Sequence, residues 1–287
     1  MTLRLIVDRL HMPECLRWQD DTLWLTDIWG HQVLQVDADG SARVIHEFPE
    51  DEDPAGLGWL PDGRLLVVGM LGRVVYIVDG GEVTVHADLR HLASFPLNDM
   101  IVAADGTAYV SGFGWDVWGG GNYADSALIR VRPDGRIDTV AEAMMAPNGI
   151  ALAADGRSIV VAEPAGGRLS RFTVTGDGDL TDRQLIPIEK AEGAAHVTPD
   201  GICLDAEGAV WAADPIGRRV IRVLPDGALD RVIPIEVGYP LACVLGARDR
   251  RTLFIAIGAA TSKNDRPVEP GGRLVAVEVE IAGAGQP

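Results

Sequence analysis

Short apolar segments, separated by residues that favour turns, recur along the whole chain. In the clearest cases a polar residue opens the segment, and an acidic residue followed by glycine closes it, as at Asp105-Gly106, Asp155-Gly156 and Glu207-Gly208. The residues between are rich in valine, isoleucine and leucine, which favour strands, while Asp-Gly pairs favour tight turns between antiparallel strands. No segment keeps a helical hydrophobic period over three turns, so the pattern predicts an all-β protein.

The opening residue of each segment occupies a shared register, seven positions before the acidic residue of the turn. This register occurs at six places: Glu14, Ala55, Asn98, Asn148, Asp200 and Ala242. Successive places are roughly 40 to 50 residues apart, which is the size of a four-stranded propeller blade. The repeat predicts a six-bladed β-propeller that forms a single domain over residues 1–287.

Further strand-like segments follow each register position. In the second repeat they cover residues 65–69, 74–78 and 82–86, and a similar outer segment is present at 42–45 in the first. Residues 3–7 are predicted to complete the last blade and close the ring, which would remove free sheet edges. The alternative is a pair of β-sandwiches, but sandwich strands do not repeat as four-stranded units.

The first strand of each propeller blade lines the central channel, so the register positions are expected to form a ring around it. Four of the six carry oxygen donors: Glu14, Asn98, Asn148 and Asp200. Hard cations bind carboxylate and amide oxygens, and two carboxylates balance a divalent charge, so the ring predicts one divalent metal ion in the channel. Calcium is the preferred ion, with zinc, magnesium and manganese as alternatives.

A competing interpretation of the same residues is that they cap turns. Asn148 and Asp200 each precede glycine, a common arrangement in turns, whereas Glu14 precedes Cys15 and fits this interpretation poorly. Turn capping also leaves unexplained why all four residues share one register. The metal hypothesis is therefore preferred.

Charge and cysteine content restrict the partners and the compartment. The net charge of −17 excludes a nucleic-acid partner, because the phosphate backbone would be repelled. Three cysteines, each in an apolar context, indicate buried free thiols. Residues 1–10 lack the apolar core of a signal peptide, and no stretch is long enough to span a membrane. A cytoplasmic protein without a membrane partner is expected.

A glycine-rich segment over residues 113–123 carries Trp115, Trp118 and Tyr123. Flexible glycines beside large aromatics suggest a lid over an apolar or aromatic substrate, although the same side chains could pack between blades. His196 and His11 lie shortly before Asp200 and Glu14 and are candidates for proton transfer, or are loop histidines without a catalytic task. Predicted substrate contacts are Asn98, Trp115, Trp118 and His196.

Four inner-strand motifs carry a family resemblance: Pro13-Glu14, Leu97-Asn98-Asp99, Pro147-Asn148-Gly149 and Pro199-Asp200-Gly201. They resemble the SMP-30/gluconolactonase/luciferin-regenerating enzyme family, to which regucalcin belongs. The resemblance covers nearly the whole chain. It implies a six-bladed propeller with a catalytic divalent cation that hydrolyses a lactone. Squid-type organophosphate hydrolases are similar in holding calcium by a Glu, Asn, Asn and Asp set.

The resemblance also implies roles. Asp200 would be the general base and a metal ligand, Glu14 chiefly a ligand, and Asn98 a ligand, a substrate contact or both. Sugar-lactone members commonly carry arginine at the position of Pro96, so its absence favours a bulkier, less hydroxylated lactone. Two other functions stay open: a metal-dependent lyase or isomerase acting on a cyclic substrate, and a non-catalytic binding propeller with a structural metal.

Overall fold

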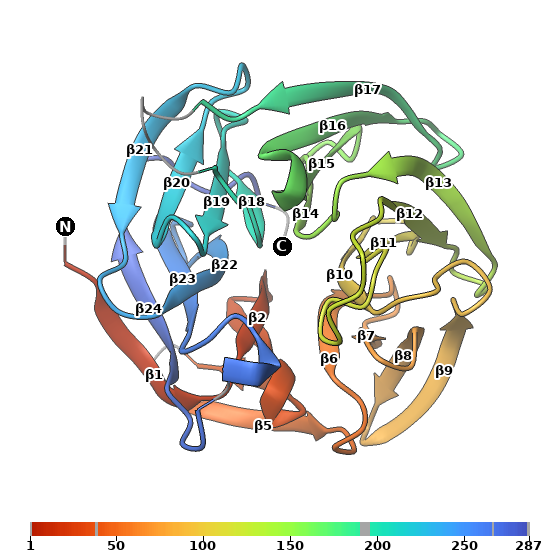
Figure 1. Ribbon diagram of the computed structural model, residues 1–287, viewed down its shortest axis with the longest axis horizontal. Helices are drawn as coiled ribbons and strands as arrows, with labels where there is room; N and C mark the ends of the chain where they lie inside the picture. Colours follow the sequence, from red (N-terminus) through yellow and green to blue (C-terminus); the bar gives the residue numbers. More distant parts are fainter. Residues whose placement is uncertain (1, 38–39, 190–195, 266, 286–287) are drawn as a thin grey trace.

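The computed structural model describes residues 2–37, 40–189, 196–265 and 267–285. Within these ranges 24 strands form six four-stranded antiparallel sheets, arranged as the blades of a propeller around a central channel (Figure 1). The inner strands β2, β6, β10, β14, β18 and β22 surround the centre. The predicted six-bladed β-propeller is therefore confirmed.

Each blade contains four consecutive strands, except blade six, whose outer strand is β1. Blades one and two contain β2 (Pro13–Gln19), β3 (Thr22–Asp27), β4 (Gln32–Val36), β5 (Ala42–Glu47), β6 (Pro54–Trp59), β7 (Leu65–Gly69), β8 (Val74–Asp79) and β9 (Glu82–Asp88). Blades three and four contain β10 (Leu97–Val102), β11 (Ala108–Gly112), β12 (Ser126–Val131), β13 (Ile137–Met144), β14 (Ile150–Leu152), β15 (Ser158–Glu163), β16 (Arg168–Val174) and β17 (Leu180–Pro187). Blades five and six contain β18 (Ile202–Leu204), β19 (Val210–Asp214), β20 (Arg219–Val223), β21 (Leu229–Pro234), β22 (Tyr239–Gly246), β23 (Thr252–Gly258), β24 (Gly272–Glu278) and β1 (Arg4–Leu10).

The two ends of the chain close the ring. β1 pairs antiparallel with β24, with Arg4 opposite Ala276 and Leu10 opposite Gly272. The N-terminal strand thus supplies the outer strand of blade six, as predicted. Because the last blade is completed by a strand from the start of the chain, opening the ring would require that sheet to break.

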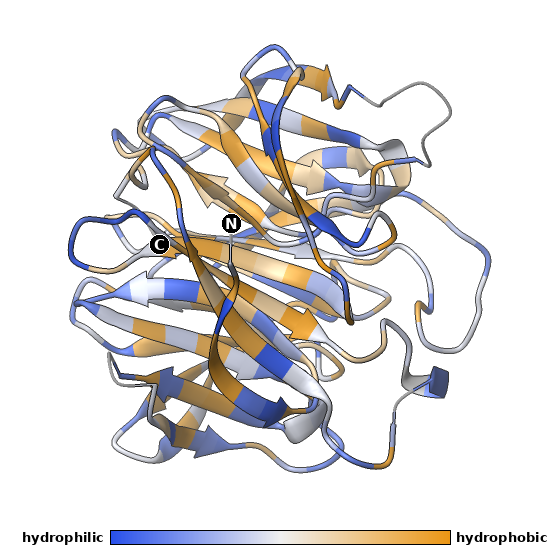
Figure 2. Cartoon of the chain, turned by 90° about the vertical axis from the view of Figure 1, so that its left-hand side faces the viewer, coloured by the Kyte–Doolittle hydropathy of each residue, from blue (hydrophilic) through white to orange (hydrophobic). Residues whose placement is uncertain are grey.

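Hydrophobic residues run along the strands, and hydrophilic residues gather in the connecting loops (Figure 2). Inner and second strands are buried almost throughout, as in β7, whereas outer strands such as β9 alternate with exposed positions. Apolar side chains of neighbouring blades pack together, and one buried cluster joins Ala151 and Val160 of blade four to Ile202 and Val210 of blade five. This packing sets the distance between adjacent inner strands.

Bulges shape the inner strands where they face the channel. The pairing register shifts between Glu14 and Arg17 in β2, and equivalent shifts follow Pro54 in β6 and Leu97 in β10. A bulge re-aims side chains and ends regular pairing. Its repetition at one level explains why residues near the start of a mainly apolar strand, such as Glu14 and Asn98, can face the channel.

Blade six departs from the predicted register. A Cβ added at Gly149 would lie 2.8 Å from the Cα of Gly201, and one added at Gly201 would lie 2.6 Å from the Cα of Ala242. Ala242 is therefore equivalent to Gly201, so Leu241, and not Ala242, takes the place of Asp200. The prediction was wrong by one residue because eight positions separate Leu241 from its turn residue Asp249. The close approach also explains the need for glycine at positions 149 and 201.

Short 3₁₀ helices occur in three connections: η1 (Ile28–Gly30), η2 (Pro164–Gly166) and η3 (Lys263–Asp265). η1 and η2 follow second strands and carry Ile28 and Pro164 to one end of the channel. In the described part of the chain, no helix is long and apolar enough to cross a membrane.

Candidate active site in the channel

A cavity of about 470 Å³ opens at the end of the channel where the inner strands begin. Its walls come from the starts of inner strands and from the loops after second strands. All four predicted metal ligands line this one cavity: Glu14, Asn98, Asn148 and Asp200. The tertiary structure thus brings together side chains from blades one, three, four and five.

Two of these residues lie in strands and two lie just before them. Glu14 and Asn98 are buried members of β2 and β10. Asn148 and Asp200 precede β14 and β18, yet their backbone N–H groups still donate to the carbonyls of Ala162 and Ala213, at 3.0 and 2.9 Å. These bonds extend the ladder past the regular strand and hold both residues at the level of Glu14.

The predicted substrate contacts also reach the cavity. Trp115, Trp118 and His196 line it together with Asn98, and the Nε2 atom of His196 lies 3.1 Å from the carbonyl oxygen of Pro164. His11 is not among the lining residues, and its backbone N–H donates to the Asp27 carboxylate at 2.9 Å. Pro96 lines a separate surface hollow next to Trp118.

The aromatic segment forms part of the cavity wall and also packs against the propeller. The ring of Trp118 meets the buried ring of Trp29 edge-on, with centroids 6.2 Å apart. Trp115 contacts Phe113 and Tyr123, with centroids 5.4 and 5.0 Å away. The two predicted roles are therefore compatible, because Trp118 packs on blade one while it faces the cavity.

The remaining cavity wall is mainly apolar. Sequence analysis did not single out the side chains that form it: Met12, Ile28, Met70, Leu241 and Ile216. They flank the polar residues at strand ends, where hydrophobicity in the sequence does not distinguish a cavity wall from a core. The result is a polar floor beneath apolar and aromatic walls, the usual composition of a small-molecule site.

Burial controls the protonation of the floor. Burial raises the pKa of Glu14 from 4.5 to about 8, and the charge of Asp99 adds to this effect. The pKa of Asp200 is also well above its ordinary value, first because of burial and then because of the charges of Glu14 and Asp99. Three carboxylates therefore share one region of low dielectric.

Within the described residues, Asp99 is the one of these three carboxylates that forms an ion pair, although the charge of Arg17 also lowers the pKa of Glu14 against the larger effect of burial. Arg17 Nη2 lies 2.6 Å from Asp99 Oδ1, and both side chains are buried. Neither residue has a role in the site predicted from the sequence. The available signal was a charged residue at an inner position of each of two apolar strands, but their pairing across 82 positions was not visible.

Carboxylates at the ends of second strands support the loops that surround the cavity. Asp27, Glu163 and Asp214 accept hydrogen bonds from the backbone N–H groups of Met12, Met145 and Thr198, at 2.6, 2.6 and 3.1 Å. These donors lie two or three residues before Glu14, Asn148 and Asp200. The repeated contact fixes the approach of the chain to each polar position and was not recognised in the sequence.

The donor set fits a hard cation. Asp200 Oδ1 is buried and has no hydrogen-bond partner within the described residues. Among those residues no group of three or more His, Cys, Asp or Glu side chains could hold a metal ion, so the two carboxylates would depend on the Asn98 and Asn148 amides. A buried carboxylate oxygen without a hydrogen-bond partner is costly, and so are two neighbouring carboxylates that form no ion pair among the described residues. A cation with oxygen ligands would remove both costs.

Comparison with known proteins gives a consistent result. Residues 12–259 match the family described as SMP-30/gluconolactonase/LRE-like region. A 6-deoxy-6-sulfogluconolactonase from Pseudomonas putida is 28% identical and covers 96% of this chain and 94% of its own length. A pentonolactonase from Haloferax volcanii is 24% identical, with 99% and 96% covered. The structure of a calcium-binding protein, regucalcin, from Agrobacterium tumefaciens superposes with a TM-score of 0.79 at 19% identity, covering 100% of this chain and 96% of that one.

Proposed function

Because this chain belongs to the SMP-30/gluconolactonase/LRE-like family, we propose that it is a gluconolactonase-like lactonase, which opens a lactone ring by hydrolysis at the cavity floor. The observation that carries this proposal is the convergence of Glu14, Asn98, Asn148 and Asp200 in one cavity. The two relatives named above are lactonases, and each aligns with nearly the full length of this chain. This similarity supports lactone hydrolysis as the reaction.

We propose that Glu14, Asn98, Asn148 and Asp200 hold one divalent cation, with calcium preferred. The raised pKa of Glu14 and of Asp200 supports this assignment, as do the Oδ1 atom of Asp200, which has no partner within the described residues, and a structural neighbour described as calcium-binding. When bound, the cation would polarise the lactone carbonyl and balance the negative charge that develops on its oxygen.

Asp200 is the proposed general base. Its carboxylate has two oxygens, so it can contribute to a cation site and still accept a proton from water. The water oxygen bonds to the carbonyl carbon as Asp200 takes the proton. The ring carbon–oxygen bond then breaks, the proton passes to the ring oxygen, and a hydroxy acid leaves the cavity.

The proposed substrate carries an apolar or aromatic portion. Trp115 and Trp118 stand at the cavity wall with Met12 and Leu241, and such walls bury apolar surface. Asn98 and His196 supply polar contacts from the floor and the rim. The named relatives act on sugar lactones, so substrate choice is the point on which this chain is expected to differ.

The oxidation state of the cysteines indicates the cellular compartment in which the protein works. Cys15, Cys203 and Cys243 are all free and buried. Free thiols are typical of reducing compartments, which supports the proposal of a cytoplasmic protein.

A lactone panel tests the function. Ring opening is followed by acid release and by product mass for sugar lactones and phenyl-substituted lactones, with and without a chelator, and with Asp200→Asn. Hydrolysis adds the mass of one water molecule, whereas a lyase or isomerase leaves the mass unchanged. We expect activity that the chelator and Asp200→Asn abolish. A folded, calcium-binding protein that opens no lactone would contradict the proposal.

A matched control is available in the same blade. Asp205 is buried and paired with Arg222 at 2.7 Å, but it is not part of the cavity. Asp205→Asn should lower stability and retain lactone opening, which separates loss of the general base from loss of any buried carboxylate.

A further inference from the structure

Arg17 binds three neighbouring inner strands with one guanidinium group. Its side chain is buried, and it donates from Nη1 to the Leu16 carbonyl at 2.9 Å and from Nε to the Leu57 carbonyl at 3.2 Å. Nη2 donates to Asp99 Oδ1 at 2.6 Å and to the carbonyl of Met100. One side chain thus links β2, β6 and β10.

Asp99 extends this link to a fourth strand. Besides Arg17, its Oδ1 accepts the Met100 N–H at 2.8 Å, and its Oδ2 accepts the Ile150 N–H of β14 at 3.3 Å. Together Arg17 and Asp99 connect the inner strands of blades one, two, three and four. We call this pair the Arg17–Asp99 bracket.

Three of the four polar floor residues lie beside the bracket in the chain. Glu14 is three residues before Arg17, Asn98 directly precedes Asp99, and Asn148 is two residues before Ile150. The distance between blades at the bracket therefore determines how far apart these three side chains stand in the cavity.

The chemistry of the bracket requires arginine. A guanidinium presents five N–H donors in a planar fork, and here it serves three carbonyls and one carboxylate in different directions. A lysine ammonium in the same place keeps the charge but has three donors at a single nitrogen. Lysine can therefore balance the charge of Asp99, but it cannot bond to all the carbonyls by which Arg17 holds the strands in place.

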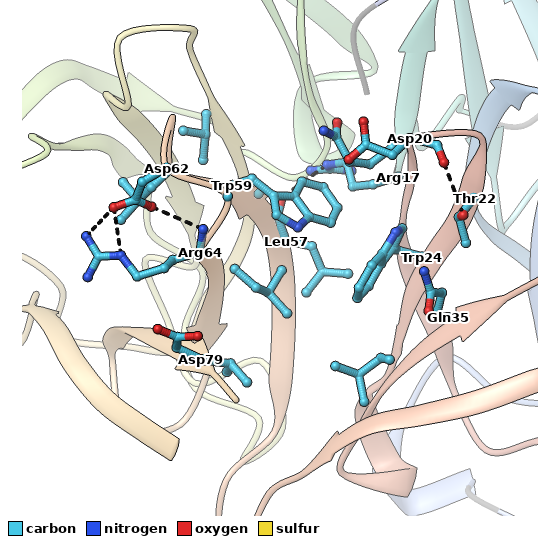
Figure 3. Close-up of a pocket in the computed structure, with 18 of the residues that line it drawn as sticks. Arg17, Asp20, Thr22, Trp24, Gln35, Leu57, Trp59, Asp62, Arg64 and Asp79 are labelled. Carbon is cyan, nitrogen blue, oxygen red and sulfur yellow. Dashed lines mark hydrogen bonds and ion pairs between the residues drawn. The ribbon is translucent and has the colours of Figure 1, made fainter. Parts of the chain in front are cut away.

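The far side of Arg17 borders a wide groove of about 1110 Å³ between blades one and two. Figure 3 shows Arg17 and Trp24, which pair across β2 and β3 on the blade-one wall of the groove, facing Leu57 and Trp59 of blade two. Trp24 and Trp59 meet edge-on with centroids 5.3 Å apart. Arg17 thus borders the groove on one side while its side chain stays buried.

We propose that Arg17 is a positioning residue for the lactone-opening site, because its bracket with Asp99 sets the spacing of Glu14, Asn98 and Asn148. The kinetic consequences rest on the proposed function, but the geometric ones do not. Arg17 does not line the cavity, so it acts through the strands that it binds.

The test compares Arg17→Lys and Arg17→Met with a matched control, Arg222→Met. Arg222 is a second buried arginine, paired with Asp205, Glu207 and Asp230 in blade five, and it does not line the cavity. Titration calorimetry measures the calcium affinity of each variant, and steady-state kinetics measures kcat and KM for the best lactone. The crystal structure of Arg17→Lys is compared with that of the unmodified protein.

We expect Arg17→Lys to fold and to weaken calcium binding by about ten- to hundredfold, as the loss of a residue that orients ligands does. The kcat should fall more than KM rises. In the crystal structure the side chains of Glu14, Asn98 and Asn148 should stand farther apart. Arg222→Met should lose stability while calcium affinity and KM stay unchanged.

Several outcomes would overturn the proposal. Unchanged calcium affinity and kcat in a folded Arg17→Lys or Arg17→Met variant would exclude a positioning role, and equal effects of Arg222→Met would reduce it to general stability. If Arg17→Met does not fold, Arg17→Lys decides. If the unmodified protein opens no lactone or binds no calcium, the proposed function fails, and unchanged spacing of the three floor side chains in the Arg17→Lys crystal structure still refutes the role of Arg17.

Discussion

Glu14 and Asp200 come from blades one and five, yet the charge of Glu14 adds to the effect of burial in raising the pKa of Asp200. Both face the same cavity, and burial is the largest cause of the raised pKa of each. Two such carboxylates compete for protons unless a cation neutralises them. The stability of the folded protein therefore depends on whether these two carboxylates are protonated or neutralised by a bound cation.

Calcium is expected to stabilise the protein against heat. A ligand that binds only the folded state at about a hundred times its Kd adds about 2.7 kcal/mol to the free energy of unfolding. The melting temperature should rise with calcium and fall with a chelator, as measured by differential scanning calorimetry. Glu14→Gln combined with Asp200→Asn should abolish the dependence, while Asp205→Asn should keep it at a lower melting temperature. A calcium-independent melting temperature would contradict the cation site.

The stability of the chelator-treated protein should fall as pH rises from about 4.5 to about 8. Glu14 has a pKa of about 8 when folded and 4.5 as the ordinary value, so in this range the unfolded chain has released a proton that the folded protein retains. Asp200 contributes in the same direction. Urea unfolding at several pH values measures the slope.

Two changes should flatten this pH dependence. Glu14→Gln removes one titrating group, and excess calcium removes the cost of ionising the cavity floor because binding favours the deprotonated carboxylates. A chelator-treated protein whose stability rises over the same range would refute the raised pKa of Glu14.

Ser111→Ala is expected to destabilise the junction between blades three and four. The buried Ser111 hydroxyl accepts the Asp99 N–H at 3.0 Å and donates to the Asn148 carbonyl at 2.8 Å. Its loss leaves a buried donor and a buried acceptor without this partner, which costs about 1–3 kcal/mol of unfolding free energy. Urea denaturation measures the change, and a loss no greater than that of an exposed control such as Ser94→Ala would contradict it.

Trp115→Ala should weaken the binding of lactones that carry an apolar group more than the binding of lactones without one. Trp115 lines the cavity and rests on Phe113 and Tyr123, whereas Trp118 also packs on the buried Trp29. KM for a phenyl-substituted lactone should rise about tenfold, corresponding to about 1.4 kcal/mol, while KM for a small unsubstituted lactone stays close to its original value. Trp24→Ala, in the groove of Figure 3, is the control and should change neither. Equal effects on both lactones would exclude a selective contact.

The features that could be predicted from the sequence are those that the repeat specifies. The Asp-Gly turns and the shared register predicted six blades, ring closure by residues 3–7 and the convergence of four polar residues. The prediction failed by one residue in blade six, because counting back from Asp249 assumes the same spacing in every blade and places Ala242 where Leu241 lies. A bulge or an added residue changes which side chain faces the channel without changing the apolar character of the strand.

The sequence by itself determined the kind of chemistry that the channel can hold, because donor types are a property of the residues: two carboxylates and two amides at one level of the repeat. Only the tertiary structure decided how those donors behave. It buries Glu14 and pairs Arg17 with Asp99, so that among the described residues neither Glu14 nor Asp200 forms an ion pair. Desolvation and pairing depend on what packs around a group in space, and the partners here come from strands far apart in the chain.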